Sequence, residues 1–216
     1  MIIKKYPQSH LVVLNNNSKL VIDPGNITFN QLLPDGRQRF KAEEFIGANG
    51  YLITHQHADH MDPANIKAVV GDNPVFGNLD VVTKLSEYGI KATAVSSRQK
   101  FSIGEFDIET VDLPHCKMVD GSAGPPNTGF LINDIFFHPG DGIELKDFSV
   151  DNLALPIAGP SIDFEKAVNF AKALKAKLII PIHYNSRFAA DPKQLQALLK
   201  DIKVVSLDFG EEITIE

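Results

Sequence analysis

The sequence predicts an α/β (α+β) domain in which two β-sheets face each other and carry helices on their outer faces. Short apolar runs of strand length alternate with helical segments along the 216 residues. Several of these runs are apolar throughout, as expected of strands whose two faces are both covered. Two sheets flanked by helices accommodate this pattern. The length and the 44% hydrophobic content suit one domain with a sizeable core, and we expect residues 1–216 to form it.

The expected strands lie mostly in the first two thirds of the chain, and each coincides with a short apolar run. In order they are residues 2–6, 11–15, 19–23, 50–54, 92–96, 106–113, 128–133, 135–138, 152–157, 177–182, 203–206 and 212–216.

The expected helices are indicated by their first turns and by apolar stripes. Asp62 can cap a helix that has Pro63 at its first position, and Asp191 and Pro192 open the last helix in the same way. Ser161 is the expected N-cap of the third helix, whose apolar stripe belongs to the core. The four helices are expected over residues 63–70, 79–88, 161–175 and 191–200.

The most informative feature of the chain is a cluster of three imidazoles and one carboxylate within six residues. It reads His55-Gln56-His57-Ala58-Asp59-His60 and follows an apolar run. Side chains two apart on an extended segment point the same way, so His55 and His57 can hold one ion. Imidazole nitrogen suits zinc, copper, iron and nickel, and a carboxylate adds charge. The pattern favours a metal site over an ordinary polar surface turn.

Three further histidines stand where an apolar strand ends. These are His115, His138 and His183, and Asp141 follows His138 by three residues. Strand ends meet at a sheet edge where loops gather and sites are built. His10 instead precedes an apolar run near the N-terminus, and we interpret it as structural, because most lone histidines simply form hydrogen bonds.

The order His-x-His-x-Asp-His, a lone His, Gly-Asp and a late His resembles the metallo-β-lactamase-fold hydrolase superfamily. The resemblance runs from Ile22-Asp23-Pro24-Gly25 to Pro181-Ile182-His183-Tyr184-Asn185. Segments 155–159 and 180–185 are similar to the branch that contains ascorbate-6-phosphate lactonase. The resemblance implies a four-layer αββα metallo-β-lactamase-like sandwich and a metal-dependent hydrolase, an esterase, lactonase or phosphodiesterase.

Two divalent metal ions are implied by the same resemblance. One would be held by His55, His57 and His115 and the other by Asp59, His60 and His183, with Asp141 between them. Two dications, two carboxylates and a bridging hydroxide leave a net charge near +1, which favours an anionic substrate. The metal-bridging hydroxide is the expected nucleophile, and Asp59 and Asp141 are the expected catalytic carboxylates. Zinc is the first expectation, with manganese or iron next, because magnesium and calcium prefer oxygen ligands.

Three residues near the motifs have open roles. Gly142 stands where the family has threonine or serine, so one hydrogen bond to the site is expected to be missing. Asp23 is either a buried acid beneath the metals or a turn residue before Pro24. His138 either supports the site or contacts the substrate.

The expected substrate is a small anionic ester, lactone or phosphodiester. Arg187 and Lys117 follow two proposed ligands and could bind its anionic group, Arg187 with two prongs, or both could be solvated surface cations. The long segments 24–49 and 117–127 are either surface connections or binding loops; the first could fold over the site mouth and the second must border it. The alternative function is a mononuclear iron oxygenase acting on a thiol or persulfide. His57 argues against the di-iron type, which usually has glutamate there.

Composition excludes several partners and places. The net charge of −6 and the lack of a basic cluster exclude a nucleic-acid substrate. No apolar run is long enough for a membrane span or a signal peptide. The single cysteine, Cys116, is compatible with a reducing cytoplasm, which is the expected location. Because Cys116 and His115 are adjacent on a strand end, they point apart, and we expect a buried thiol in preference to a metal thiolate.

Overall fold

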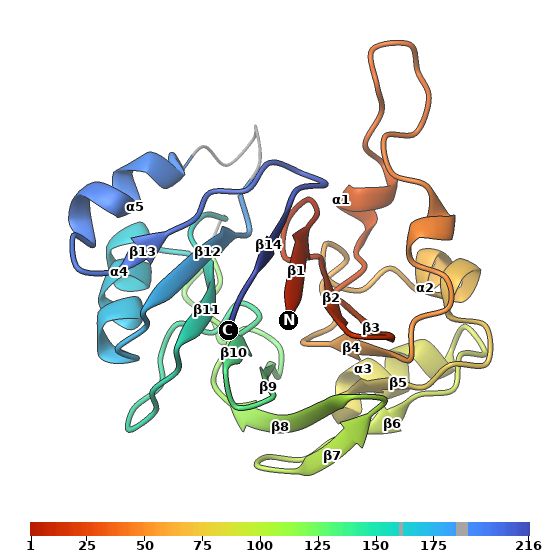
Figure 1. The fold of residues 1–216 in the computed structure, drawn as a ribbon. Coiled ribbons are helices and arrows are strands. Elements are labelled where there is room, and N and C mark those ends of the chain that lie inside the picture. Colours follow the sequence, from red (N-terminus) through yellow and green to blue (C-terminus); the bar gives the residue numbers. More distant parts are fainter. Residues whose placement is uncertain (160–161, 185–189) are drawn as a thin grey trace.

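Two seven-stranded sheets pack face to face in the computed structural model, which describes residues 1–159, 162–184 and 190–216 (Figure 1). The first sheet has the order β14 (Glu212–Thr214), β1 (Ile2–Lys5), β2 (Leu11–Asn15), β3 (Ser18–Ile22), β4 (Gly50–Ile53), β5 (Val75–Gly77) and β6 (Thr93–Ala94). The second has the order β13 (Lys203–Val204), β12 (Leu178–Ile182), β11 (Asn152–Pro156), β10 (Phe136–His138), β9 (Thr128–Ile132), β8 (Phe106–Asp112) and β7 (Lys100–Ile103).

Strand direction decides where the loops gather. In the first sheet β3, β4, β5 and β6 are parallel. In the second sheet β10, β11, β12 and β13 are parallel, and β8 runs in the same direction as β10 because β9 is antiparallel to both. The carboxyl ends of these strands therefore share one edge of each sheet, which is where binding sites of such sheets form.

The core between the sheets is built from the inward-facing residues of both. Leu20 and Leu52 of the first sheet pack with Phe106, Phe130 and Ile180 of the second, all with no exposed surface. Their neighbours point the other way and bury against helices, so the central strands are apolar on both faces. The continuous apolar runs of the sequence have this cause.

Helices cover both outer faces. Ile66 of α2 (Pro63–Val70) and Val81 of α3 (Leu79–Ser86) are buried with Tyr51 of the first sheet. Phe170 of α4 (Phe164–Ala173) and Leu195 of α5 (Pro192–Leu198) are buried on the second sheet. The expected four-layer αββα sandwich is confirmed. Within the described residues no helix is long and apolar enough to cross a membrane.

The helix starts follow the sequence signals with one exception. The side chain of Asp62 accepts a hydrogen bond from the Asn65 backbone N–H at 2.9 Å, as an N-cap should. Asp191 caps α5 in the same manner. The expected cap Ser161 lies outside the described residues, and α4 begins at Phe164 with Asp163 as its N-cap. The Asp163 side chain accepts a hydrogen bond from the Lys166 backbone N–H at 3.1 Å.

Each expected strand is present, several of them shorter, and two strands were missed. β5 has only three residues, and β7 is a mostly exposed edge strand, so neither produces an apolar run. The segment 24–49 holds α1 (Asn26–Phe29) and a short 3-10 helix, η1 (Ala42–Glu44). Between them the chain projects away from the body as a narrow hairpin (Figure 1).

Candidate metal centre

The proposed ligands and their supporting acid come from strand ends on the shared edges. Asp23 follows β3 directly, and His55 follows β4 by two residues. His115, Asp141 and His183 follow β8, β10 and β12. The motif after β4 supplies the remaining ligands before Asp62 starts α2. Residues far apart in the chain thus meet at one place.

Four of the ligands form the first group. Ligand atoms of His55, His57, His115 and Asp141 all lie within 4.8 Å of one another. His55 Nε2 lies 3.1 Å from His57 Nδ1, and His115 Nε2 lies 3.5 Å from Asp141 Oδ2. The structure brings together the residues expected to hold one ion.

Asp59, His60 and His183 form the second group, with the same mutual limit of 4.8 Å. His183 Nε2 lies 3.2 Å from Asp59 Oδ2 and 3.2 Å from Asp141 Oδ2. His60 Nε2 lies 3.2 Å from Asp141 Oδ1. Asp141 therefore faces both groups, which is the position that a carboxylate shared between two ions requires.

Unsatisfied buried atoms show that the donor set fits metal ions. Nε2 of His60, His115 and His183 and Oδ1 of Asp141 are buried and form no hydrogen bond. Each of these nitrogens lies 3.2–3.5 Å from an Asp141 oxygen without forming a hydrogen bond, so the converging atoms fit an ion placed among them. Five imidazoles and two carboxylates suit zinc, iron or manganese better than magnesium or calcium.

Asp23 is a buried support of the ligands, which settles its open role. One of its oxygens accepts the Thr54 backbone N–H at 2.8 Å, and the other accepts the Thr54 hydroxyl at 2.8 Å. The second oxygen also lies 2.8 Å from His60 Nδ1. A proton held on Nδ1 leaves the Nε2 lone pair of His60 free for a metal.

Backbone carbonyls orient two further imidazoles in the same way. His115 Nδ1 lies 2.6 Å from the carbonyl oxygen of Cys116, and His183 Nδ1 donates to that of Ala158. His183 itself has a φ of +56°, a backbone conformation that residues other than glycine rarely adopt. Such local strain is typical of functional sites.

The Asp141 carboxylate and its neighbouring imidazoles stabilise each other's charged forms, which shifts their pKa values. Burial lowers the pKa of His115 and His183, but the Asp141 carboxylate outweighs burial and raises the pKa of each to about 10. Burial raises the pKa of Asp141, but His183 and His60 hold it well below its usual range. Burial lowers the pKa of His55 and His57. A metal ion that enters must displace the protons from the charged imidazoles.

Three glycines let the loops close on the ligands. A Cβ at Gly25 would overlap the backbone carbonyl of Asp59, and one at Gly124 would overlap the His115 ring. A Cβ at Gly159 would lie 2.9 Å from Cε1 of His183. Any side chain at these positions would push a ligand out of place.

A cavity of about 310 Å³ opens over both groups. Apart from ligands and Ala58, its walls are the apolar side chains of Met118 and Ile162. Met118 comes from segment 117–127, which therefore borders the site as expected. The expectation that segment 24–49 folds over the site mouth was wrong: its phenylalanines are buried with Tyr6 on the outer face of the first sheet. The cavity is lined by His57, Ala58, Asp59, His115, Met118, Asp141, Ile162 and His183.

Of the three residues proposed to contact the substrate, the two that the structure describes, His138 and Lys117, do not line the cavity. His138 is fully buried; its Nε2 lies 2.9 Å from the Ser9 carbonyl oxygen, and its Nδ1 accepts the Gly140 N–H. It supports the loop that carries Asp141 and does not line the cavity. Lys117 is exposed and is not a lining residue either. Arg187 lies outside the described residues.

The remaining histidine and the cysteine are structural neighbours of the site. His10 is buried, with its ring against Tyr6 and Phe45 and its Nδ1 3.0 Å from the Thr28 hydroxyl. Cys116 is half-buried, and its sulfur lies 3.7 Å from His115 Nδ1, so the expectation of a buried thiol that points away from His115 was wrong. Among the described residues Cys116 belongs to neither ligand group.

Sequence reasoning missed two polar residues beside the ligands. Gln8 Nε2 donates to Asp59 Oδ2 at 3.1 Å. Asn127 accepts the Asp141 N–H through Oδ1 and donates to the Pro139 carbonyl through Nδ2. Neither lies in a recognisable motif, and only the three-dimensional structure reveals their contacts.

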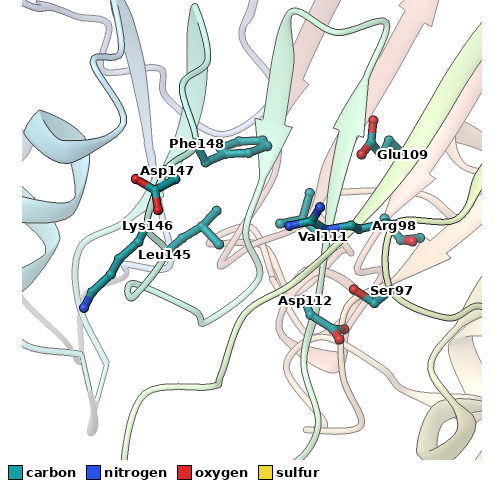
Figure 2. A pocket seen from close by; sticks show the side chains of 10 residues that line it. Ser97, Arg98, Glu109, Val111, Asp112, Leu145, Lys146, Asp147 and Phe148 are labelled. Atoms are coloured by element: carbon teal, nitrogen blue, oxygen red, sulfur yellow. The ribbon is translucent and has the colours of Figure 1, made fainter.

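A second hollow on the surface differs from the cavity over the two ligand groups because it contains no proposed ligand. It has a volume of about 340 Å³ and is lined by the loop at Ser97 and Arg98, by β8 and by residues 145–148. Figure 2 shows its lining, in which cations and carboxylates are mixed. It contains none of the ligands, so the cavity over the two ligand groups is the candidate functional site.

Fold and ligands together define a sandwich protein of the metallo-β-lactamase fold. The family described as beta-lactamase superfamily domain matches residues 3–183, and the chain belongs to it. A curated relative, a UPF0173 metal-dependent hydrolase of Nanoarchaeum equitans, is 26% identical over 97% of this chain and 98% of the relative. A relative of the same name from Pyrococcus abyssi is 26% identical over 93% of each chain.

Solved structures share the fold at lower identity. Igni18, a metallo hydrolase from Ignicoccus hospitalis, superposes with a TM-score of 0.77 at 21% identity and covers 100% of this chain and 98% of its own. CmlA, a diiron beta-hydroxylase from Streptomyces venezuelae, has a TM-score of 0.75 at 13% identity, with 99% and 54% covered. The class that the comparisons support better is a metal-dependent hydrolase of the metallo-β-lactamase fold.

Proposed function

We propose that this protein is a metal-dependent hydrolase with two divalent ions, zinc before manganese or iron, that acts on a small ester, lactone or phosphodiester. The observation that carries the proposal is the position of Asp141, whose two oxygens face both ligand groups. When bound, the ions supply an acidified water as nucleophile and a Lewis acid for the substrate oxygen.

The chain's own residues have separate tasks in this reaction. Asp141 and the five imidazoles would hold the two ions, and Asp141, His57, His115 and His183 also line the cavity. Asp59 is the carboxylate that reaches solvent, with 29% of its side chain exposed, whereas Asp141 has 7% exposed. Asp59 is therefore placed to orient the attacking water and to accept its proton.

The cavity limits the size of the substrate. A volume of about 310 Å³ lies at the lower end of small-ligand sites and favours a small substrate. A lactone is favoured by the sequence resemblance to the ascorbate-6-phosphate lactonase branch. An anionic group on the substrate is favoured by the charge near +1 that two ions would leave in the site.

Elemental analysis of purified protein, combined with a panel of lactones, phosphodiesters and thioesters, tests the proposal. We expect two ions per chain and hydrolysis of at least one class. One iron per chain, with oxygen consumed in the presence of a thiol or persulfide and no hydrolysis, would instead establish the alternative iron oxygenase.

Arg187 is proposed to bind the anionic group of the substrate. Arg187→Ala should raise KM for charged esters with little change in kcat, because uniform binding appears in KM, and should spare neutral analogues. Arg98→Ala, an exposed arginine in the hollow of Figure 2, is the matched control and should leave both constants unchanged. Equal losses with charged and neutral esters would contradict the binding role.

Met118 and Ile162 are the walls that an apolar substituent of the substrate must contact. Each buried methylene contributes about 0.8 kcal/mol, so kcat/KM should rise about fourfold per added carbon over a short ester series. Ile162→Ala should flatten that rise, whereas Ile46→Ala, at an exposed isoleucine outside the cavity, should keep it. Identical slopes in Ile162→Ala and the unaltered enzyme would show that the substrate avoids this wall.

A further inference from the structure

We infer that Gln8 is a positioning residue for the second ligand group and sets the affinity of that ion in particular. The inference rests on the proposed two-ion site. Gln8 precedes the histidine motif by nearly fifty residues and carries no sequence signal. It lies in the turn between β1 and β2, with 2% of its surface exposed.

The turn holds Gln8 in an unusual conformation. Tyr6 N–H donates to the His10 carbonyl at 2.9 Å, and His10 N–H donates to that of Pro7 at 3.3 Å, which closes the turn. Gln8 has a φ of +59°, where a side chain is strained. A non-glycine residue kept in this region of backbone space is typical of a site where the side chain has a task.

Gln8 contacts two of the three residues in the second group, Asp59 and His183. Its side-chain Nε2 donates to Asp59 Oδ2 at 3.1 Å, and its backbone carbonyl accepts the His183 N–H at 3.0 Å. Oδ2 is the same Asp59 oxygen that lies 3.2 Å from His183 Nε2. The amide therefore fixes the carboxylate with its ligand oxygen facing the imidazole across the ion position.

The imidazoles of the first group are oriented from elsewhere. Thr54 Oγ1 lies 3.1 Å from His55 Nδ1, and the Cys116 carbonyl holds His115. Removing the Gln8 amide leaves these contacts in place. The loss should fall on the second ion, since Asp59, a ligand of the second group, would lose a hydrogen bond that holds its carboxylate.

The turn itself has anchors that do not involve the Gln8 side chain. The neighbouring Ser9 carbonyl is bonded to His138, and His10 is bonded to Thr28. A substitution that keeps the length of the side chain should therefore leave the turn folded. Gln8→Met meets this condition, because methionine has nearly the shape of glutamine and lacks its amide.

The test compares Gln8→Met with the unaltered protein by elemental analysis and by chelator competition with zinc. The dissociation constant of the ion in the second ligand group should rise about 10- to 100-fold, the usual effect of losing a partner of a metal ligand. The dissociation constant of the ion in the first group should stay the same. The melting temperature of the metal-free protein should not change. Gln38→Met is the matched control, since Gln38 bonds only the Phe29 carbonyl among the described contacts, in the projecting segment.

The possible results separate the two proposals. Fewer than two ions in the unaltered protein would overturn the two-ion site itself. Two ions bound with equal affinities in Gln8→Met and the unaltered protein would overturn only the role of Gln8. A uniform weakening of both ions, or a lower melting temperature of the metal-free variant, would show a general structural role and would also overturn the inference.

Discussion

Asp141→Ala is expected to lower metal occupancy at both ion positions, from two ions per chain to fewer than one at micromolar metal. The reason is geometric: Oδ2 faces His115 and His183, and Oδ1 faces His60, so one carboxylate serves both groups. Its loss also removes one of two negative charges that offset four positive ones, and Asp141→Asn should have nearly the same effect. Elemental analysis after dialysis measures the result.

His138→Gln is the matched control for this prediction. His138 is as buried as Asp141 and lies three residues before it, but its two ring nitrogens are bonded to Ser9 and Gly140 and face away from the ligand groups. Its substitution should leave metal content nearly unchanged. Two ions at unaltered affinity in Asp141→Ala would disprove the shared role, and strong metal loss in His138→Gln would show that metal binding depends on the support that His138 gives to the loop of Asp141.

The sequence was sufficient for those parts of the site that depend on local order. The motif at residues 55–60 is visible because its spacing alone brings imidazoles to one side of an extended segment. His115, Asp141 and His183 were found because each follows an apolar strand, and parallel strands present their carboxyl ends at one edge. The arrangement of two sheets with helices outside them was predictable because strands that are covered on both faces are apolar throughout.

The parts that the sequence could not predict depend on contacts between segments that are distant in the chain. Gln8 reaches Asp59 because β1 runs in the same direction as β3 and β4, which brings the β1–β2 turn to the edge where the loop after β4 lies, and no periodicity records that contact. Asp163 caps α4, and the sequence alone does not distinguish it from Ser161, because both residue types are good N-caps. The short strand β5 owes its existence to pairing with β4 and not to its own three residues.

Asp59→Asn is expected to lower kcat at least about 100-fold, the scale of lost acid–base assistance, and this is the largest catalytic effect that we predict. Asp59 is the partly exposed carboxylate that lines the cavity, hydrogen-bonded to Gln8 and close to His183. An amide in its place cannot accept a proton from water. Because Asp59 is also a proposed ligand, kcat must be expressed per chain that contains two ions. Asp62→Asn is the matched control: it lies three residues on, caps α2 outside the cavity, and asparagine caps as well as aspartate. The control should retain normal turnover. If fully loaded Asp59→Asn turned over the best substrate at the unaltered rate, proton transfer would have to be assigned to another group.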